Sequence, residues 1–282
     1  MNIDIFIETR KRLHLSQDQL AQGICTQATL SKFERNGKVP SLKILLQLCD
    51  RLELTLNDLF PLNHDEDSVR SQALEQAEFQ LLVGEYDAAQ ESLAKLGDPA
   101  SGTLNFQMRF YFIRGYVTAL NGGSIADALY DFSQILNRFD EGHHSMYSLL
   151  AYTGMGVAYD RDGDTTRAEF YFNKVASEIH NLTFKNNHSI WRSLNIIYYT
   201  GQFYGQTGDL KASDELLNYG VQVCARYHVT YYLARILYQR AVNVRAQNGD
   251  VAAIKQDLQD AAAFARLNSN EKLLKLIAKF DI

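Results

Sequence analysis

The sequence predicts an all-α protein in which a small N-terminal domain precedes a domain of helical repeats. Only three of its 282 residues are proline, and no segment alternates apolar and polar residues as a half-buried strand would. Glycines recur about every forty residues from residue 84 onward, each between two segments of helical periodicity. These observations favour a solenoid over a sandwich, a barrel or an α/β fold.

Length and composition describe a globular chain with no bulk preference for nucleic acid. The 282 residues suffice for one large or two ordinary domains, and 46% are hydrophobic against 22% charged. The net charge is −5, but residues 1–63 hold eight Lys and Arg against seven Asp and Glu. Any affinity for DNA must therefore come from local placement of charge near the N-terminus.

The sequence also predicts the cellular compartment. Its three cysteines (Cys25, Cys49 and Cys224) are an odd number without metal-ligand spacing, so we expect reduced thiols. Acidic residues interrupt the N-terminus too early for a signal peptide, and no apolar run approaches the ~18 residues of a membrane span. We expect a cytoplasmic protein that does not bind a membrane.

Five short helices are expected in residues 1–63. The first covers residues 2–13, with Ile3, Phe6, Ile7 and Leu13 as its buried stripe. A fourth begins at Pro40-Ser41, with Leu42, Leu45, Leu48, Cys49 and Leu52 at helical spacing, and a fifth covers residues 55–60. Pro61 and the acidic stretch at 64–67 mark the best domain boundary in the chain.

The second and third helices carry the clearest functional signal. Ser16 and Gln19 form a capping box that opens the second helix, and Gly23 ends it. Thr26 then caps a third helix that buries Leu30 and Phe33. Its opposite face has no large apolar side chain, which suits a helix that enters the major groove of DNA.

These residues resemble a known family. Ser16-Gln17, Leu20-Ala21, residues 23–25, and residues 30–37 followed by Pro40 are similar to the DNA-binding domain of Cro/lambda-repressor-like (XRE) proteins. The stretch from Leu20 to Ser41 resembles most the PlcR/Rgg (RRNPP) branch of peptide-responsive regulators, whose shorter turn it shares. The resemblance implies a helix-turn-helix that binds a palindromic operator as a homodimer.

The position of each polar side chain predicts its contact with DNA. Gln27, at the start of the third helix, can pair with adenine, and Thr29 can touch a thymine methyl or a phosphate. Gln17, Lys32 and Arg35 suit phosphates, although Gln17 has capping support as an alternative. The predicted DNA-binding residues are Gln17, Thr26, Gln27, Ala28, Thr29, Ser31, Lys32 and Arg35.

Five repeats are expected after residue 63, with turn glycines at 84, 122, 163, 208 and 249. Small residues recur seven before the turn (Ala77, Gly115, Gly156, Gly201) and five after it (Ala89, Ala168, Ser213), with Ala128 counted from Gly123. Large residues at Leu93, Phe132, Phe172, Leu217 and Leu258 fill the space behind. The pattern resembles tetratricopeptide (TPR) repeats, lengthened from the usual ~34 residues, with a capping helix at 271–281.

A concave surface lined by the first helix of each repeat is the expected ligand site. Inward positions should fall about 13, 10 and 6 residues before each turn glycine. They hold Arg109, Phe112, Tyr116, Asn195, Tyr198, Gln202, Gln239 and Asn243. Amides can donate to and accept from a peptide backbone at once, so we expect a peptide there, with Asn195 and Asn243 as solvent-facing clamps. The alternative is that these are ordinary solvated or inter-repeat polar residues.

Other chemistry has weaker support. His143-His144 lacks a third metal ligand, Asp162-Gly-Asp164 lacks the remaining calcium ligands, and Tyr198, Tyr199 and Tyr204 suit helix packing. The sequence contains no phosphate-binding loop or nucleophile elbow, so we expect no enzyme, no cofactor and no metal. The expected function is a transcription regulator controlled by a signalling peptide (quorum sensing). The alternative is a TPR adaptor, tethered to DNA by its helix-turn-helix, that docks a protein partner.

Overall fold

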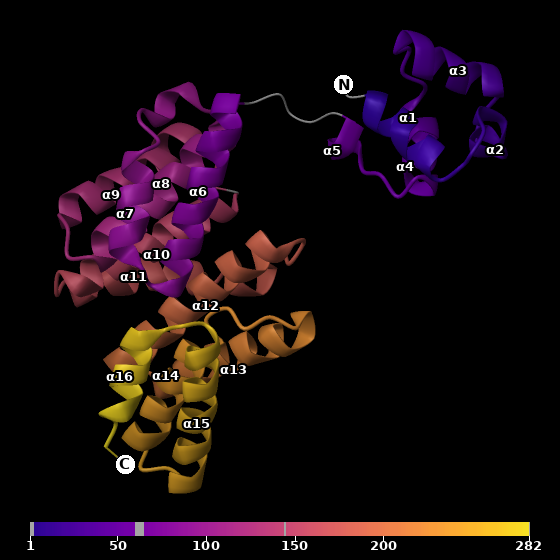
Figure 1. The fold of residues 1–282 in the computed structure, drawn as a ribbon. Coiled ribbons are helices and arrows are strands. Elements are labelled where there is room, and N and C mark those ends of the chain that lie inside the picture. Colours follow the sequence, from indigo (N-terminus) through magenta and orange to yellow (C-terminus); the bar gives the residue numbers. More distant parts are fainter. Residues whose placement is uncertain (1–2, 60–64, 144, 282) are drawn as a thin grey trace. The chain divides into compact units, whose positions relative to one another are not determined.

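The structure is a computed structural model that describes residues 3–59, 65–143 and 145–281. The chain divides into two compact units, Met1–Val69 and Arg70–Ile282, and every regular element in the described ranges is a helix (Figure 1). The boundary predicted at Pro61 and residues 64–67 falls partly outside these ranges. No helix in them is long and apolar enough to cross a bilayer.

The N-terminal unit has the five helices that were predicted. They are α1 (Ile3–Arg12), α2 (Gln17–Ala21), α3 (Gln27–Asn36), α4 (Leu42–Arg51) and α5 (Leu56–Leu59). They share a single apolar core, in which the rings of Phe6 and Phe33 pack edge to face with their centroids 5.1 Å apart. Two predicted core positions are wrong: Leu13 is 45% exposed and Leu42 is 63% exposed. Leu13 lies just beyond the end of α1, and Leu42 is the first residue of α4.

The second unit stacks five helix pairs, as predicted, and ends in a single helix (Figure 1). The pairs are α6 (Asp65–Val83) with α7 (Tyr86–Ala94), α8 (Leu104–Leu120) with α9 (Ile125–Gln134), α10 (Met146–Arg161) with α11 (Thr165–Ala176), α12 (Asn187–Thr207) with α13 (Leu210–Tyr227), and α14 (Leu233–Ala246) with α15 (Val251–Leu267). The last helix is α16 (Glu271–Ala278), and short 3-10 or π turns occupy Pro99–Ser101, Ile135–Phe139 and Ile179–Asn181.

Three of the predicted small residues, Gly115, Gly156 and Gly201, lie where two helices of a pair approach closely. A Cβ atom at Gly115 would come within 2.7 Å of the Phe132 ring, and one at Gly156 within 2.8 Å of the Phe172 ring. Phe132, Phe172 and Leu217, three of the large residues predicted to fill the space behind the small ones, are therefore direct neighbours of these glycines. Ala89, Ala168 and Ser213, the small residues after the turns, are fully buried.

The inner amides do not face solvent, so that expectation is wrong. Asn195 and Asn243 have no exposed surface. Asn195 donates through Nδ2 to the Tyr232 hydroxyl at 2.6 Å, and Tyr232 covers it. Asn243 donates to the Ser213 hydroxyl at 2.7 Å and to the Asp214 carboxylate at 2.8 Å, which joins α14 to α13. These amides connect neighbouring repeats.

Replacing Gly156 by Ala should destabilise the second unit, although Ala ordinarily favours a helix. The added Cβ meets a buried ring, and overpacking of this kind costs about 1–3 kcal/mol. Urea unfolding followed by the fluorescence of Trp191, the single tryptophan of the chain, measures the change. Adding Phe172→Leu should recover part of the loss. Equal or greater stability in Gly156→Ala alone would contradict the close approach.

Replacing Asn243 by Ala should also weaken the second unit, by about 1–3 kcal/mol, because it leaves buried partners without a donor. The matched control is Gln256→Ala, which removes an exposed amide whose partner is Asp260 on the same helix. That control should change the free energy of unfolding by less than about 0.5 kcal/mol. Urea unfolding followed by Trp191 fluorescence measures both variants. Equal losses of unfolding free energy in the two would show that Asn243 does not hold α14 to α13.

Candidate functional site

Helix α3 presents a polar face to solvent and buries its apolar face. The Thr26 side chain caps it by accepting from the backbone N–H of Thr29 at 3.2 Å, and Leu30 and Phe33 are fully buried. The helix ends at Gly37, which is in the left-handed region at φ 65°. Of the predicted DNA-binding residues, Thr26, Gln27, Ala28, Lys32 and Arg35 are exposed, and Gln17, Thr29 and Ser31 are half-buried.

A chain of polar contacts fixes the start of α3 against its neighbours. Arg10 of α1 forms a two-pronged ion pair with Glu34 of α3, with N–O distances of 2.7 and 2.9 Å. Gln17 of α2 donates to Glu34 at 2.7 Å, and Gln27 donates to the Oε1 atom of Gln17 at 2.7 Å. Gln27 is therefore oriented by a network that reaches back to α1.

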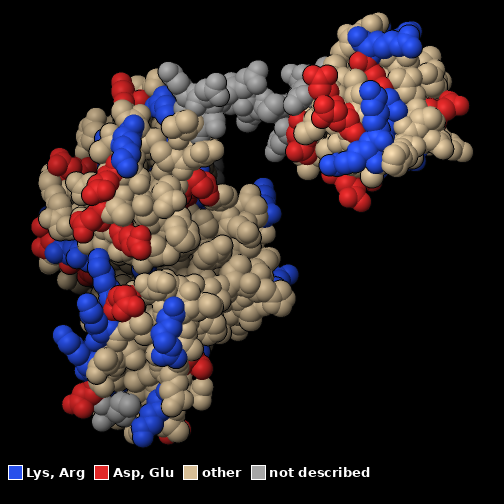
Figure 2. All heavy atoms as spheres, viewed as in Figure 1, with Lys and Arg blue, Asp and Glu red and all other residues tan. Residues whose placement is uncertain are grey.

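Sequence reasoning missed part of this network. The guanidinium of Arg10 is engaged by the Glu34 carboxylate and by the Leu15 carbonyl. Arg51 of α4 was not singled out, yet it donates to the carbonyls of Leu20 and Gln22 at the end of α2. Figure 2 shows Lys and Arg interspersed with Asp and Glu on the visible face of this unit, in agreement with its near-neutral charge.

The second unit contains three neighbouring hollows, two of which are lined by residues of α6. We call them together the inner trough. The basic hollow, of about 410 Å³, is lined by Arg109, Lys185 and Arg192, and the middle hollow, of about 210 Å³, by Glu78, Phe79 and Trp191. The end hollow, of about 370 Å³, is lined by Phe79, Tyr231, Arg235 and Leu267.

The three hollows share lining side chains. His188 borders both the basic and the middle hollow, and Phe79, Leu82 and Tyr231 border both the middle and the end hollow. No more than one layer of side chains separates each hollow from the next. The basic and end hollows each fall in the lower part of the roughly 300–1,000 Å³ range of ligand pockets.

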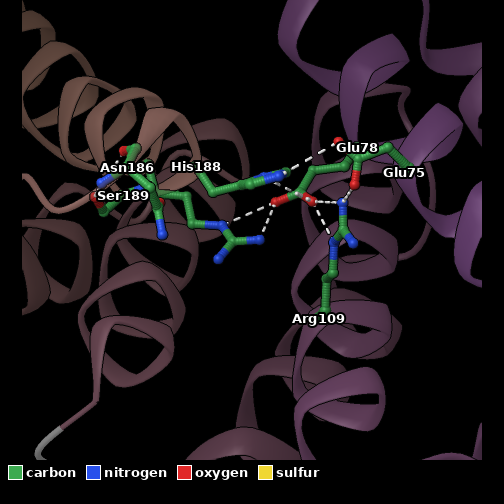
Figure 3. A network of polar contacts seen from close by, with 7 residues as sticks. Glu75, Glu78, Arg109, Asn186, His188 and Ser189 are labelled. Carbon is green, nitrogen blue, oxygen red and sulfur yellow. Dashed lines mark hydrogen bonds and ion pairs between the residues drawn. The ribbon is translucent and has the colours of Figure 1, made fainter. Parts of the chain in front are cut away.

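Glu78 lies at the centre of the inner trough and joins three helices. Its side chain is buried, at 2% exposure, and it pairs with Arg109 of α8. Arg192 of α12 donates to the same carboxylate from Nε at 2.8 Å and from Nη2 at 2.6 Å. Figure 3 shows Glu75 and Glu78 of α6 facing Arg109 on one side and His188 of α12 on the other. Both partners are needed to offset the desolvation of a buried carboxylate.

The same cluster has the composition of a cation site but not its charge balance. Ligand atoms of Glu75, Glu78 and His188 lie within 4.8 Å of one another. Two guanidinium groups already neutralise Glu78, so a divalent ion would have to displace at least one of them. Burial alone would raise the pKa of Glu75, but the hydrogen bond and charge of Arg109 lower it below its usual value. The cluster is better suited to holding helices together.

The eight predicted peptide-binding residues are placed very unequally. Arg109 lines the basic hollow, and Gln202 is half-buried. The other six are buried in the helix packing: Phe112, Tyr116, Asn195, Tyr198, Gln239 and Asn243. The rest of the trough lining includes residues within helices, such as Glu78 and Trp191, and residues at helix ends and in the turns between repeats, such as Tyr231 and Leu267. Residues in turns do not recur at a fixed distance from the turn glycines, so the expected spacing of inward positions could not identify them.

The weaker candidate sites have structural roles. Both nitrogens of His143 are engaged, Nδ1 with the Tyr152 hydroxyl at 2.5 Å and Nε2 with the Leu136 carbonyl at 3.1 Å, and His144 lies outside the described residues. Asp164 caps α11, and Tyr198 and Tyr199 are core residues. The three cysteines are free thiols, with Cys49 and Cys224 buried.

Residues 7–59 match the sequence profile of the helix-turn-helix family. No curated protein sequence matches the chain. Among solved structures it is similar to Bacillus thuringiensis PlcR in complex with the peptide PapR7 and DNA, at 15% identity and a TM-score of 0.75 over 99% of both chains.

Two further structures share the fold. ComR from S. thermophilus, in complex with DNA and its signalling peptide ComS, is 12% identical with a TM-score of 0.67 over 97% of this chain and 96% of that one. The Streptococcus dysgalactiae SHP pheromone receptor Rgg2 is 12% identical with a TM-score of 0.57 over 99% and 98%. Residues 7–59 are therefore a helix-turn-helix domain, and the whole chain has the fold of PlcR, ComR and Rgg2.

Proposed function

We propose that this protein is a DNA-binding transcription regulator of the PlcR/Rgg type, controlled by a short signalling peptide that binds in the inner trough. It acts in the cytoplasm, where its DNA target lies, and it is a binding protein rather than an enzyme. The observation that carries the proposal is the combination in one chain of a helix-turn-helix with an exposed polar α3 and a row of neighbouring hollows in the repeat unit.

The exposed face of α3 supports DNA binding. Gln27 stands at its first turn, where side chains reach base edges, and a glutamine amide can pair with adenine through two hydrogen bonds. Lys32 and Arg35 lie farther along the helix and are exposed, with no carboxylate within ion-pair distance among the described residues. They are free to neutralise phosphates, which position the helix without reading sequence.

The shape of the inner trough favours a peptide over a folded partner. Its hollows are each a few hundred Å³ and lie between helices, so an extended chain can enter them and a globular surface cannot. Basic side chains line the two outer hollows, and the middle hollow has an apolar wall beside the paired carboxylate of Glu78, so the trough suits an occupant with both apolar and acidic groups. PlcR and ComR, which share this fold, have been crystallised with both peptide and DNA.

The small size of the N-terminal unit is the reason for proposing a homodimer. Five short helices around one small core leave little surface for a large interface, and one helix-turn-helix reads only one half-site. We therefore assign dimerisation to the repeat unit and a palindromic operator to the dimer. The peptide would act by binding one arrangement of the dimer better than another, since equal affinity for both would shift nothing.

Gln27→Ala should relax base discrimination by about 1–3 kcal/mol at one position in each half-site, because the direct contact to the base is lost. Lys32→Ala should instead weaken all duplexes alike and reduce the salt slope by about one. An operator selected from random duplexes, followed by competition with single base-pair substitutions at several salt concentrations, separates the two effects. An unchanged operator preference in Gln27→Ala would show that α3 does not read bases through this residue.

Phe79→Ser should abolish retention of peptides, because Phe79 borders two of the three hollows and supplies their apolar wall. The assay is affinity selection from a pool of random synthetic heptapeptides with the full-length protein, read by mass spectrometry. Phe170→Ser is the matched control: Phe170 of α11 is 64% exposed, against 55% for Phe79, and lines none of these hollows. Retention of a folded protein but of no peptide would favour the adaptor function instead.

A further inference from the structure

The end hollow combines an apolar wall with an arginine. Phe79 and Val83 of α6 and Leu267 of α15 form the wall, and Phe79 and Leu267 are 55% and 70% exposed. Two large apolar side chains thus remain open to solvent on the two sides of one hollow. Arg235, in the first turn of α14, lies in the same lining. An occupant that fits both must carry an apolar side chain next to a group that an arginine binds.

Arg235 differs from the other trough arginines in its partners. Arg109 and Arg192 are engaged by Glu78, whereas no carboxylate among the described residues lies within 4.0 Å of the Arg235 guanidinium. Glu85 borders the same hollow but forms no ion pair with it. A half-buried guanidinium without an anion has lost part of its hydration without compensation.

The surroundings of Arg235 hold the guanidinium in place without neutralising it. It lies over the Tyr232 ring, with its central carbon 5.2 Å from the ring centroid. On its other side is the α6–α7 turn, where a Cβ atom on Gly84 would come within 3.0 Å of Nη2. Burial raises the pKa of Tyr232 to about 12, so its hydroxyl stays neutral at physiological pH and supplies no negative charge.

Tyr232 itself is held in an unusual conformation. Its φ is 58°, in the left-handed region that bulky residues rarely adopt, and its ring is 6% exposed. The hydrogen bond from Asn195 to its hydroxyl, at 2.6 Å, helps to maintain this geometry. Such a conformation persists only where the surrounding contacts fix it, and here they place the ring beneath Arg235.

We propose that Arg235 is the carboxylate-binding residue of the inner trough: it receives a carboxylate of the bound peptide, and the adjoining apolar side chain packs between Phe79 and Leu267. This inference rests on the proposed peptide function and adds a chemical requirement to it. The carboxylate is either the C-terminus of the peptide or an Asp or Glu side chain near it. Arg235 can bind both through two parallel hydrogen bonds.

The test uses two pools of random synthetic heptapeptides, one with a free C-terminal carboxylate and one amidated, each incubated with the full-length protein. The wild type should retain the free-acid pool about tenfold better than the amidated pool, as the loss of a charge-assisted contact implies. Arg235→Gln should remove this preference, and Arg235→Lys, which keeps the positive charge, should retain part of it. Arg240→Gln is the matched control on the same helix, since Arg240 faces Asp257 at 3.4 Å, away from the hollow.

The outcomes separate this inference from the proposed function. Equal retention of both pools, with Asp or Glu enriched in the retained peptides and lost with Arg235→Gln, would support the inference and assign the carboxylate to a side chain. Retention of both pools unaffected by Arg235→Gln, but abolished by Phe79→Ser, would overturn the carboxylate contact and leave peptide binding in place. No retention from either pool by the wild type would overturn both. Trp191 fluorescence during urea unfolding checks that each variant is folded, and the comparison of the two pools on the wild type needs no variant.

Discussion

The buried carboxylate of Glu78 is the interaction on which the shape of the repeat unit depends. It belongs to the first helix of the array, yet it is held by Arg192, which lies 114 residues farther along the chain. A negative charge at 2% exposure is tolerable only with partners, and Arg109 and Arg192 together supply them. Pairing of this carboxylate thus requires a winding of the superhelix that brings α6 close to α12.

This winding creates the inner trough. The middle hollow is lined by Glu78 of α6 and Trp191 of α12, and the basic hollow by Arg109 of α8 and Arg192 of α12, so the ion pairs of Glu78 lie between these two hollows. The same arrangement sorts the positive charges of the interior. Arg109 and Arg192 pair with Glu78 and hold the helices together. Arg235, in the end hollow, has no such partner and can bind an external anion.

Local signals in the sequence predicted the helices and their pairing well. These signals depend only on residues within a few tens of positions along the chain. They include the turn glycines, the caps at Ser16 and Thr26, and the small residues facing Phe132 and Phe172. The ligand-facing residues could not be predicted in this way. Whether Asn195 faces solvent depends on Tyr232, and the position of Tyr232 depends on a left-handed backbone that no propensity favours.

The contact between the two ends of the array has a consequence for how it unfolds. An open solenoid can fray from either terminus, because each repeat touches only its neighbours. Here Lys272 of α16 donates to the Gly84 carbonyl at 3.3 Å and lies 4.9 Å from the Tyr86 ring centroid, so the terminal helix contacts the first turn. Neither end can detach without losing contacts to the other. Opening at either end should therefore cost more free energy than in a solenoid whose ends do not touch, by about 1–2 kcal/mol for these two contacts.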